Sequence, residues 1–106
     1  MIGVAPEIWS HKKASTMLQT LHRVRIPADA FDLVSWLNHN LGVTVVFPSN
    51  IIRVGARGKL VLEEDTDDGC YVWPEAVWDH YTDTDGERVF LFKNVADAVE
   101  FKLRFG

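Results

Sequence analysis

The clearest hydrophobic pattern lies near the end of the chain. Residues 88–92 (RVFLF) are apolar on both faces of an extended segment, which predicts a strand in the centre of a sheet. They follow Asp85-Gly86, and a glycine that tolerates positive φ between two apolar runs is a strong hairpin signal. A two-residue loop would set three cross-strand pairs: Thr84 with Glu87, Asp83 with Arg88, and Tyr81 with Phe90.

A helix is expected to follow this strand and to reach the end of the chain. Asn94 is a favourable N-cap residue, and Asp97 lies near the positive end of the helix dipole. Glu100 and Arg104 share a narrow polar side with Asp97, at a spacing that allows an ion pair. Apolar residues occupy most of the remaining circumference and predict a wide buried arc: Val95, Ala98, Val99, Phe101, Leu103 and Phe105.

A second helix is predicted between Asp29 and Leu41. Pro27 and Asp29 are typical of a helix start, and Gly42 is a natural residue just beyond the end. One side carries an apolar stripe made by Ala30, Leu33, Val34, Leu37 and Leu41. Trp36 falls instead among the polar residues of the opposite side.

The polar side of this helix is our candidate protein-binding surface. Exposed aromatic side chains anchor many protein interfaces, and Asp32 and His39 lie on the same side as Trp36. Trp78 is a further candidate, and a core position for Trp73 and Trp78 is the alternative. The two-residue hairpin loop would place Trp78 on one face with His80, Val89 and Leu91.

The rest of the chain is mainly extended in the predicted pattern. Residues 1–16 have no clear period and are expected to form a mobile or irregular arm, followed by a strand over 17–26. Short apolar runs predict further strands over 43–47, 51–54, 59–63, 70–73 and 76–82. The sequence therefore predicts a single α+β domain, with an antiparallel-rich sheet of about five strands and two helices on one face. The other face of the sheet would be free for a partner.

Composition limits the class of protein. The chain has 106 residues, of which 47% are hydrophobic and 25% charged, as in an ordinary globular domain that can bury a core. Cys70 is the single cysteine, so an intramolecular disulfide is excluded and a reduced, cytoplasmic setting is expected. The sequence shows neither a charged and apolar leader nor an apolar run of about 18 residues, so neither secretion nor membrane insertion is expected.

Charge is divided between the two halves of the chain. Residues 1–59 carry seven Lys or Arg against three acids, a net charge of +4, and residues 60–106 carry four against twelve, a net charge of −8. Five basic residues lie on or beside predicted strands and would form a phosphate-binding patch if those strands are neighbours: Arg23, Arg25, Arg53, Arg57 and Lys59. The alternative is a set of edge charges that prevent sheets from pairing.

No motif indicates catalysis or metal binding. The acidic turns DTDDG (65–69) and DTDG (83–86) lack the spacing of an EF-hand loop, and no two histidines have the i,i+4 spacing of a zinc site. Cys70 with His80 is the one conceivable nucleophile pair. We therefore expect a protein that is not an enzyme and uses neither metal nor cofactor.

Two stretches resemble the RNA-recognition-motif and ferredoxin-like families. RVFLFKNVADAVEF (88–101) is similar to the strand and helix of the second half of such a domain, and IPADAFDLVSWL (26–37) to the first strand-to-helix passage. The resemblance implies a ferredoxin-like α+β fold. It departs from the RNA-binding members at Glu87 and Val89, which stand where stacking aromatic residues would lie, and in ending without a fourth strand.

The final residues, DAVEFKLRFG, are also similar to the C-terminal tail of small uncharacterised proteins of tailed bacteriophages. This resemblance implies a phage origin and a location in the host cytoplasm. We expect a non-catalytic interaction or regulatory module that acts by self-association or by binding a host protein. The alternative is a small regulator that binds RNA or DNA through the basic residues.

Overall fold

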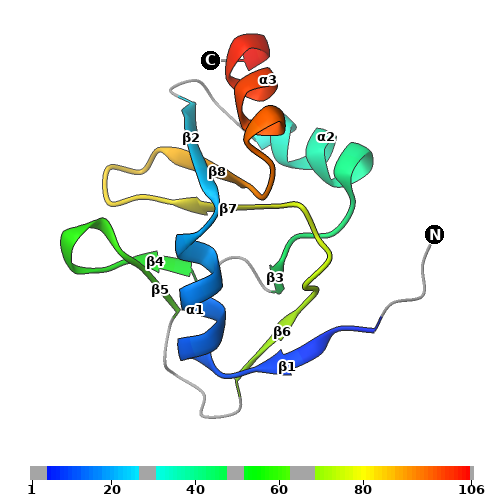
Figure 1. The fold of residues 1–106 in the computed structure, drawn as a ribbon. Helices are drawn as coiled ribbons and strands as arrows, with labels where there is room; N and C mark the ends of the chain where they lie inside the picture. Colours follow the sequence, from blue (N-terminus) through cyan, green and yellow to red (C-terminus); the bar gives the residue numbers. More distant parts are fainter. Residues whose placement is uncertain (1–4, 27–30, 48–51, 63–68, 106) are drawn as a thin grey trace.

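The computed structural model describes residues 5–26, 31–47, 52–62 and 69–105, with the side chains of residues 31 and 32 excepted. Within these ranges the chain forms three α-helices, a short 3-10 turn and eight strands in three antiparallel sheets (Figure 1). Their order is β1 (Glu7–Trp9), α1 (His11–Gln19), β2 (His22–Ile26), α2 (Phe31–Leu41), β3 (Val46–Phe47), β4 (Ile52–Val54), η2 (Ala56–Gly58), β5 (Leu60–Leu62), β6 (Cys70–Val72), β7 (Trp78–Thr82), β8 (Arg88–Phe92) and α3 (Val95–Phe105).

The sheet β2–β8–β7 is the centre of the fold. β8 pairs antiparallel with both neighbours, and Phe90 lies opposite Val24 on one side and His80 on the other. Residues 89–92 are all buried, which confirms β8 as the central strand. Because successive side chains of a strand point to opposite faces, this strand contributes to two separate cores.

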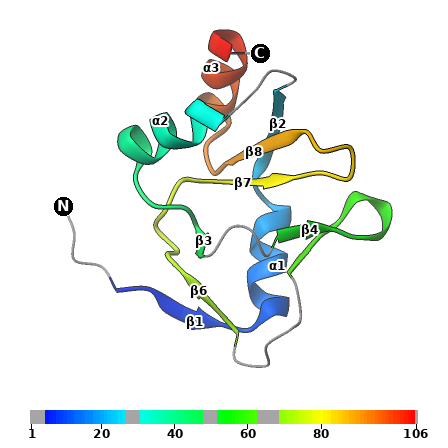
Figure 2. The same ribbon diagram turned by 180° about the vertical axis from the view of Figure 1, so that it is seen from behind.

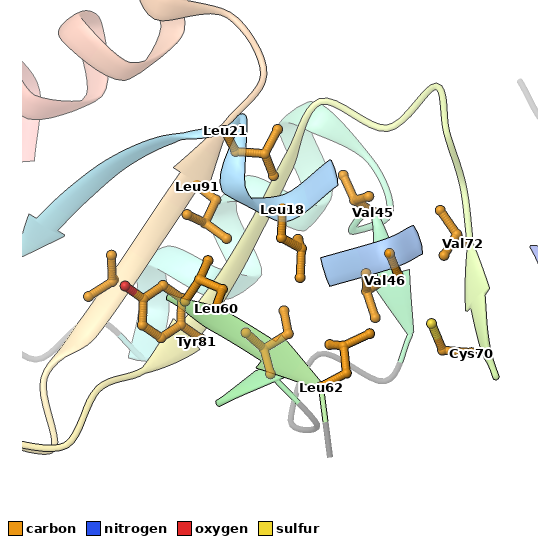
Figure 3. Close-up of a cluster of buried hydrophobic side chains, with 13 residues drawn as sticks. Leu18, Leu21, Val45, Val46, Leu60, Leu62, Cys70, Val72, Tyr81 and Leu91 are labelled. Atoms are coloured by element: carbon orange, nitrogen blue, oxygen red, sulfur yellow. The ribbon is translucent and has the colours of Figure 1, made fainter. Parts of the chain in front are cut away.

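One core lies between this sheet and the helices α2 and α3 (Figures 1 and 2). Its buried residues are Val24, Ile26, Leu37, Trp78, Phe90, Phe92, Ala98 and Phe101. The second core lies on the opposite face, where α1 and the strands of the two smaller sheets cover it (Figure 3). It contains Ala14, Leu18, Leu21, Val45, Val46, Ile52, Leu60, Leu62, Cys70, Val72, Tyr81, Val89 and Leu91.

The predicted α+β class is confirmed, but the detail of one sheet of about five strands with two helices does not fit exactly. The described strands form sheets of three, three and two strands, β1–β6–β3, β2–β8–β7 and β4–β5, instead of one sheet of about five. A third helix, α1, packs on the face of the central sheet that we expected to be free. The expected free face is therefore covered at β7 and β8, and only its β2 edge, with Arg23 and Arg25, is exposed in the described part of the chain.

Helix α1 occupies a segment that we expected to be an irregular arm and the start of a strand. The Ser10 side chain caps it by accepting a hydrogen bond from a backbone N–H of the first turn. Ala14 and Leu18, one turn apart, are fully buried in the second core. The first residues of the predicted strand over 17–26 are therefore helical, and β2 forms only its second half.

The loop of the β7–β8 hairpin is one residue longer than predicted. The Asp83 N–H donates to the Glu87 carbonyl at 2.9 Å, so three residues close the hairpin. Gly86 has a φ of +84°, as in a type I turn that is followed by a left-handed residue. The Asp83 carboxylate supports the turn by accepting hydrogen bonds from the backbone N–H groups of Asp85 and Glu87.

The longer loop shifts the strand register by one residue. Tyr81 is opposite Val89, not Phe90, and Thr82 instead of Asp83 is opposite Arg88. A shift of one residue moves every side chain of a strand to the other face relative to its partner. The predicted grouping of Trp78 with Val89 and Leu91 is therefore wrong, because Trp78 lies in the first core and the other two in the second.

A buried carboxylate ties the central sheet to the sheet β1–β6–β3. The Asp79 side chain of β7 is fully buried and accepts hydrogen bonds at 2.8 Å from the backbone N–H groups of Val46 and His80. The Val46 N–H begins the short strand β3. The Asp79 carboxyl group therefore satisfies one backbone donor from each of the two sheets.

The second helix and the strands on either side of residues 55–58 are confirmed within the described ranges. Strands β4 and β5 flank the turn at 55–58, as expected. Helix α2 ends at Leu41, and Gly42 follows with a φ of +92° and donates its N–H to the Asn38 carbonyl. The predicted start of this helix at Pro27 and Asp29 lies outside the described residues. In the part of the chain that is described, no helix has the length and apolar character needed to span a membrane.

Candidate functional site

Helix α3 exposes an apolar stripe along its outer side. Val95, Val99 and Leu103 follow one another at four-residue spacing and are 59%, 53% and 83% exposed. Ala98 and Phe101, on the opposite side, are buried against the central sheet. The prediction of a wide buried arc is therefore wrong for half of that arc, because the sheet covers only one side of the helix.

Trp36 faces outward from α2, as its position in the helix predicts. Its side chain is 39% exposed, while the adjacent Leu37 is buried. The indole makes an edge-on contact with Phe105 of α3, with ring centroids 5.4 Å apart. The Arg104 guanidinium lies 5.7 Å from the centroid of the same indole. Trp36 therefore joins the two helices at the surface of the molecule.

A cleft of about 160 Å³ lies between α2 and α3 beside this contact. Trp36 and Phe105 contribute apolar walls, and Glu100 and Arg104 contribute charged ones. The same two charged residues border a shallow groove that runs along the apolar stripe. The stripe and the cleft are therefore neighbouring parts of one surface. We call it the α2–α3 surface and define it by Trp36, Val95, Val99, Glu100, Leu103 and Arg104.

The charges on α3 are balanced. The helix carries Asp97, Glu100, Lys102 and Arg104, which give no net charge, whereas the whole chain carries −4. Among the described residues no ion pair joins Glu100 to Arg104, so the predicted i,i+4 pair is not formed. Arg104 lies over Trp36 instead, and the Glu100 carboxylate stays in the exposed ridge between stripe and cleft.

The other predicted protein-binding residues have different positions. His39 is exposed on α2. Asp32 belongs to α2, but its side chain lies outside the described residues. Trp78 is fully buried, and its indole N–H donates to the Gly42 carbonyl at 2.8 Å. Its inclusion in the binding surface was wrong, and the alternative core position is the correct one.

A second exposed apolar row crosses the sheet β1–β6–β3. Tyr71 of β6 lies opposite Ile8 of β1 on one side and Phe47 of β3 on the other. Tyr71 is 51% exposed, Ile8 68% and Phe47 56%. This row is not predictable from the sequence, because strands of two or three residues are too short for alternation to show which face is buried.

The predicted basic patch is only partly assembled. The Arg23 guanidinium donates to the Gly58 carbonyl at 2.9 Å, which brings β2 next to the turn that carries Arg57 and Lys59. Arg53 is exposed on β4 and donates to the carbonyl of the preceding residue. A basic region therefore exists around this turn, made by Arg23, Arg57 and Lys59, and it is smaller than the predicted patch.

Arg25 is not part of that region because acidic groups neutralise it. Its guanidinium pairs with the Asp83 carboxylate and lies 3.6 Å from Glu87. The charge of Asp83 raises the pKa of Arg25. Desolvation acts to raise the pKa of Asp83, but hydrogen bonds from the backbone N–H groups of Glu87 and Asp85, together with the Arg25 charge, hold it below its ordinary value.

Cys70 and His80 lie in different parts of the fold: Cys70 belongs to the second core, whereas the His80 ring stacks on Trp78 of the first core. Cys70 is buried in β6, and burial raises the pKa of its thiol. His80 of β7 lies 3.0 Å from the Arg88 guanidinium through its Nδ1. Burial and the charge of Arg88 lower the pKa of His80 to about 4. Near neutral pH the thiol is protonated and the imidazole is a weak base, the opposite of an activated pair.

The described residues also contain no group of three or more His, Cys, Asp or Glu side chains placed to hold a metal ion. A scan against protein-family models, a search of curated proteins and a search of solved structures each gave no match to this chain. The resemblances to ferredoxin-like domains and to phage tails accordingly stay predictions. The α2–α3 surface is therefore the feature from which we infer what kind of protein the chain is.

Proposed function

We propose that this chain is a non-catalytic protein-interaction module whose docking surface is the α2–α3 surface. The exposed stripe of Val95, Val99 and Leu103 carries the proposal. Full burial of such a side chain stabilises a complex by about 1.5–3 kcal/mol relative to leaving it in water. Three of them in line on one helix give a partner a continuous apolar strip to cover.

The residues beside the stripe are of the types that anchor interfaces. Tryptophan and arginine are enriched among the residues that dominate binding energy, and Trp36 and Arg104 are already held together by a ring contact. The cleft next to them has the size of a cavity that accepts a benzene-sized group. A partner side chain can therefore enter the cleft while the rest of the partner covers the stripe. The regulatory role expected from the sequence would follow from holding such a partner.

Site-specific photo-crosslinking in producing cells tests this function. A photo-reactive residue at Ala96, in the groove along the stripe, should give a cross-linked adduct. Val99→Asp should abolish the adduct, because it places a charge in the centre of the stripe. Ile8→Asp makes the same change on the distant exposed row and should leave the adduct intact. An adduct that survives Val99→Asp, or none in the unchanged chain, would show that this surface is not a docking site.

A second candidate function is binding of nucleic acid by the basic region. The observation in its favour is the Arg23 contact to Gly58, which gathers Arg23, Arg57 and Lys59 around one turn. Basic side chains in such a group can contact successive phosphates. Five acids follow β5 directly in the sequence at 63–68, which makes this candidate the weaker of the two.

A further inference from the structure

We infer that the partner on the α2–α3 surface is a second copy of this chain, bound through parallel, two-fold packing of α3 against α3. This inference rests on the proposed function and names its partner. Three features of α3 carry it: the apolar stripe, the order of charges on its two sides, and the balance of those charges.

The stripe is suited to pairing with itself. Val95, Val99 and Leu103 extend over the outer side of a helix of 11 residues. In a parallel pair related by a two-fold axis along the helices, each of these residues meets its own counterpart at the same level. Rows of side chains at four-residue spacing pack against each other in the commonest class of helix pairs in globular proteins.

The charges beside the stripe determine the direction of the second helix. At 100° per residue, Glu100 lies on one side of Val99 and Lys102 on the other. In a parallel two-fold pair, Glu100 of the first copy lies next to Lys102 of the second copy on one side of the stripe. On the other side of the stripe, Lys102 of the first copy lies next to Glu100 of the second. In an antiparallel pair, each side would meet itself, so carboxylate would face carboxylate and ammonium would face ammonium. Electrostatic complementarity therefore selects the parallel arrangement.

The cleft gives the second copy a further contact. Asp97 and Glu100 both line the cleft, and they lie on the side of α3 that faces α2. The parallel arrangement places Lys102 of the second copy on that side. Arg104 lines the same cleft, but its guanidinium lies over the Trp36 ring. The aliphatic stem of Lys102 can therefore lie along the cleft while its ammonium group reaches the carboxylates of Asp97 and Glu100. The balanced charge of α3 also spares this face the repulsion that a net charge of −4 causes between whole chains.

Sedimentation equilibrium of the full chain over a concentration series tests the inference. The unchanged protein should show a monomer–dimer equilibrium, and Leu103→Asp should weaken it at least about tenfold. Glu100→Lys and Lys102→Glu should each weaken it, because like charges then face each other. The double variant, Glu100→Lys with Lys102→Glu, should restore dimerisation, since the opposite charges meet again. Ile8→Asp is the matched control and should dimerise normally.

Disulfide trapping tests the direction of the helices. In a Cys70→Ala background, Leu103→Cys should form disulfide-linked dimers on mild oxidation, because the parallel arrangement brings the two copies of this position together. A mixture of Val95→Cys and Leu103→Cys chains should give each homodimer and little mixed dimer. Preferential mixed dimers would show an antiparallel pair and overturn the inference.

Failure of this inference and failure of the proposed function give different results. A chain that stays monomeric up to about 1 mM, while Val99→Asp still removes the adduct to another protein, refutes the second copy and leaves the docking function in place. A dimer that Leu103→Asp and the charge reversals leave unchanged uses another surface and also refutes the inference. If the adduct at Ala96 survives Val99→Asp as well, both are refuted.

Discussion

Arg104 of α3 lies over the indole of Trp36 of α2, with its guanidinium carbon 5.7 Å from the ring centroid. Phe105, which is also on α3, makes an edge-on contact with the same ring. Contacts of these two kinds are worth about 0.5–1.5 kcal/mol each when exposed or half-exposed. One aromatic side chain therefore both joins the two helices and forms part of the surface that a partner would touch.

Trp36→Ala should lower the free energy of unfolding by about 1–3 kcal/mol, because it removes both ring contacts and part of the buried indole. Urea denaturation followed by circular dichroism measures this change. At a protein concentration at which the chain is monomeric, Val99→Asp on the exposed side of α3 should stay within about 0.5 kcal/mol of the unchanged chain. If Trp36→Ala were as damaging as Trp78→Ala, for which about 3–5 kcal/mol is expected in the core, the indole would be a core residue and not a surface contact.

Gly86→Ala should destabilise the chain by about 1–2 kcal/mol, because a side chain at a φ of +84° meets the following carbonyl oxygen. Beyond residues 85–87, no atom lies within 4 Å of the added methyl group, so the loss comes from the local backbone conformation. Thr84→Ala in the same exposed loop is the control and should have little effect. Equal stabilities of the two variants would rule out the three-residue loop.

Acid should destabilise the protein through His80. The pKa of this imidazole is about 4 in the folded chain, against 6.5 for the free group. Between these two pH values the unfolded chain binds the proton more readily, so stability is complete above pH 6.5 and falls as the pH drops toward 4. The loss should reach about 3 kcal/mol. His80→Gln keeps an acceptor for Arg88 and should remove this part of the pH dependence between pH 7 and 4. Identical pH profiles would contradict the burial of His80.

The nucleic-acid candidate makes a separate prediction about salt. If the basic region binds phosphates, Arg57→Ala and Lys59→Ala should each weaken binding of a single-stranded oligonucleotide and reduce the salt slope by about one. Arg25→Ala should have no such effect, because Asp83 and Glu87 already neutralise Arg25. Filter binding from low to moderate salt measures both quantities. An absence of salt-dependent binding in the unchanged chain would eliminate this function.

The elements with strong local signals were predictable from the sequence. The strand over 88–92 and the helix after Asn94 were both placed correctly, since apolar continuity and a residue type that favours helix starts coincide there. The Asn94 side chain donates to the Asp97 carboxylate in the first turn. Helix α1 was missed because MLQTLHRVRI also alternates like a strand. Its signals were Ser10 as an N-cap and the pair Ala14 and Leu18 at helical spacing.

Other features depend on contacts that the sequence does not specify. Asp85-Gly86 is compatible with hairpin loops of two or three residues, and the support from the Asp83 carboxylate favours the longer one. The outward position of Trp36 was predictable because its neighbours in the helix divide clearly into two sides. The exposure of Val99 and Leu103 was not, because an apolar arc looks the same whether the protein's own sheet or a partner covers it.

Strands β7 and β8 contribute alternate side chains to the two cores. If one core lost its packing, the strands that also line the other core would be exposed. Such a chain should melt in a single cooperative transition. A partner that binds only the native α2–α3 surface would then raise the melting temperature of the entire chain, including helix α1 on the far side of the sheet.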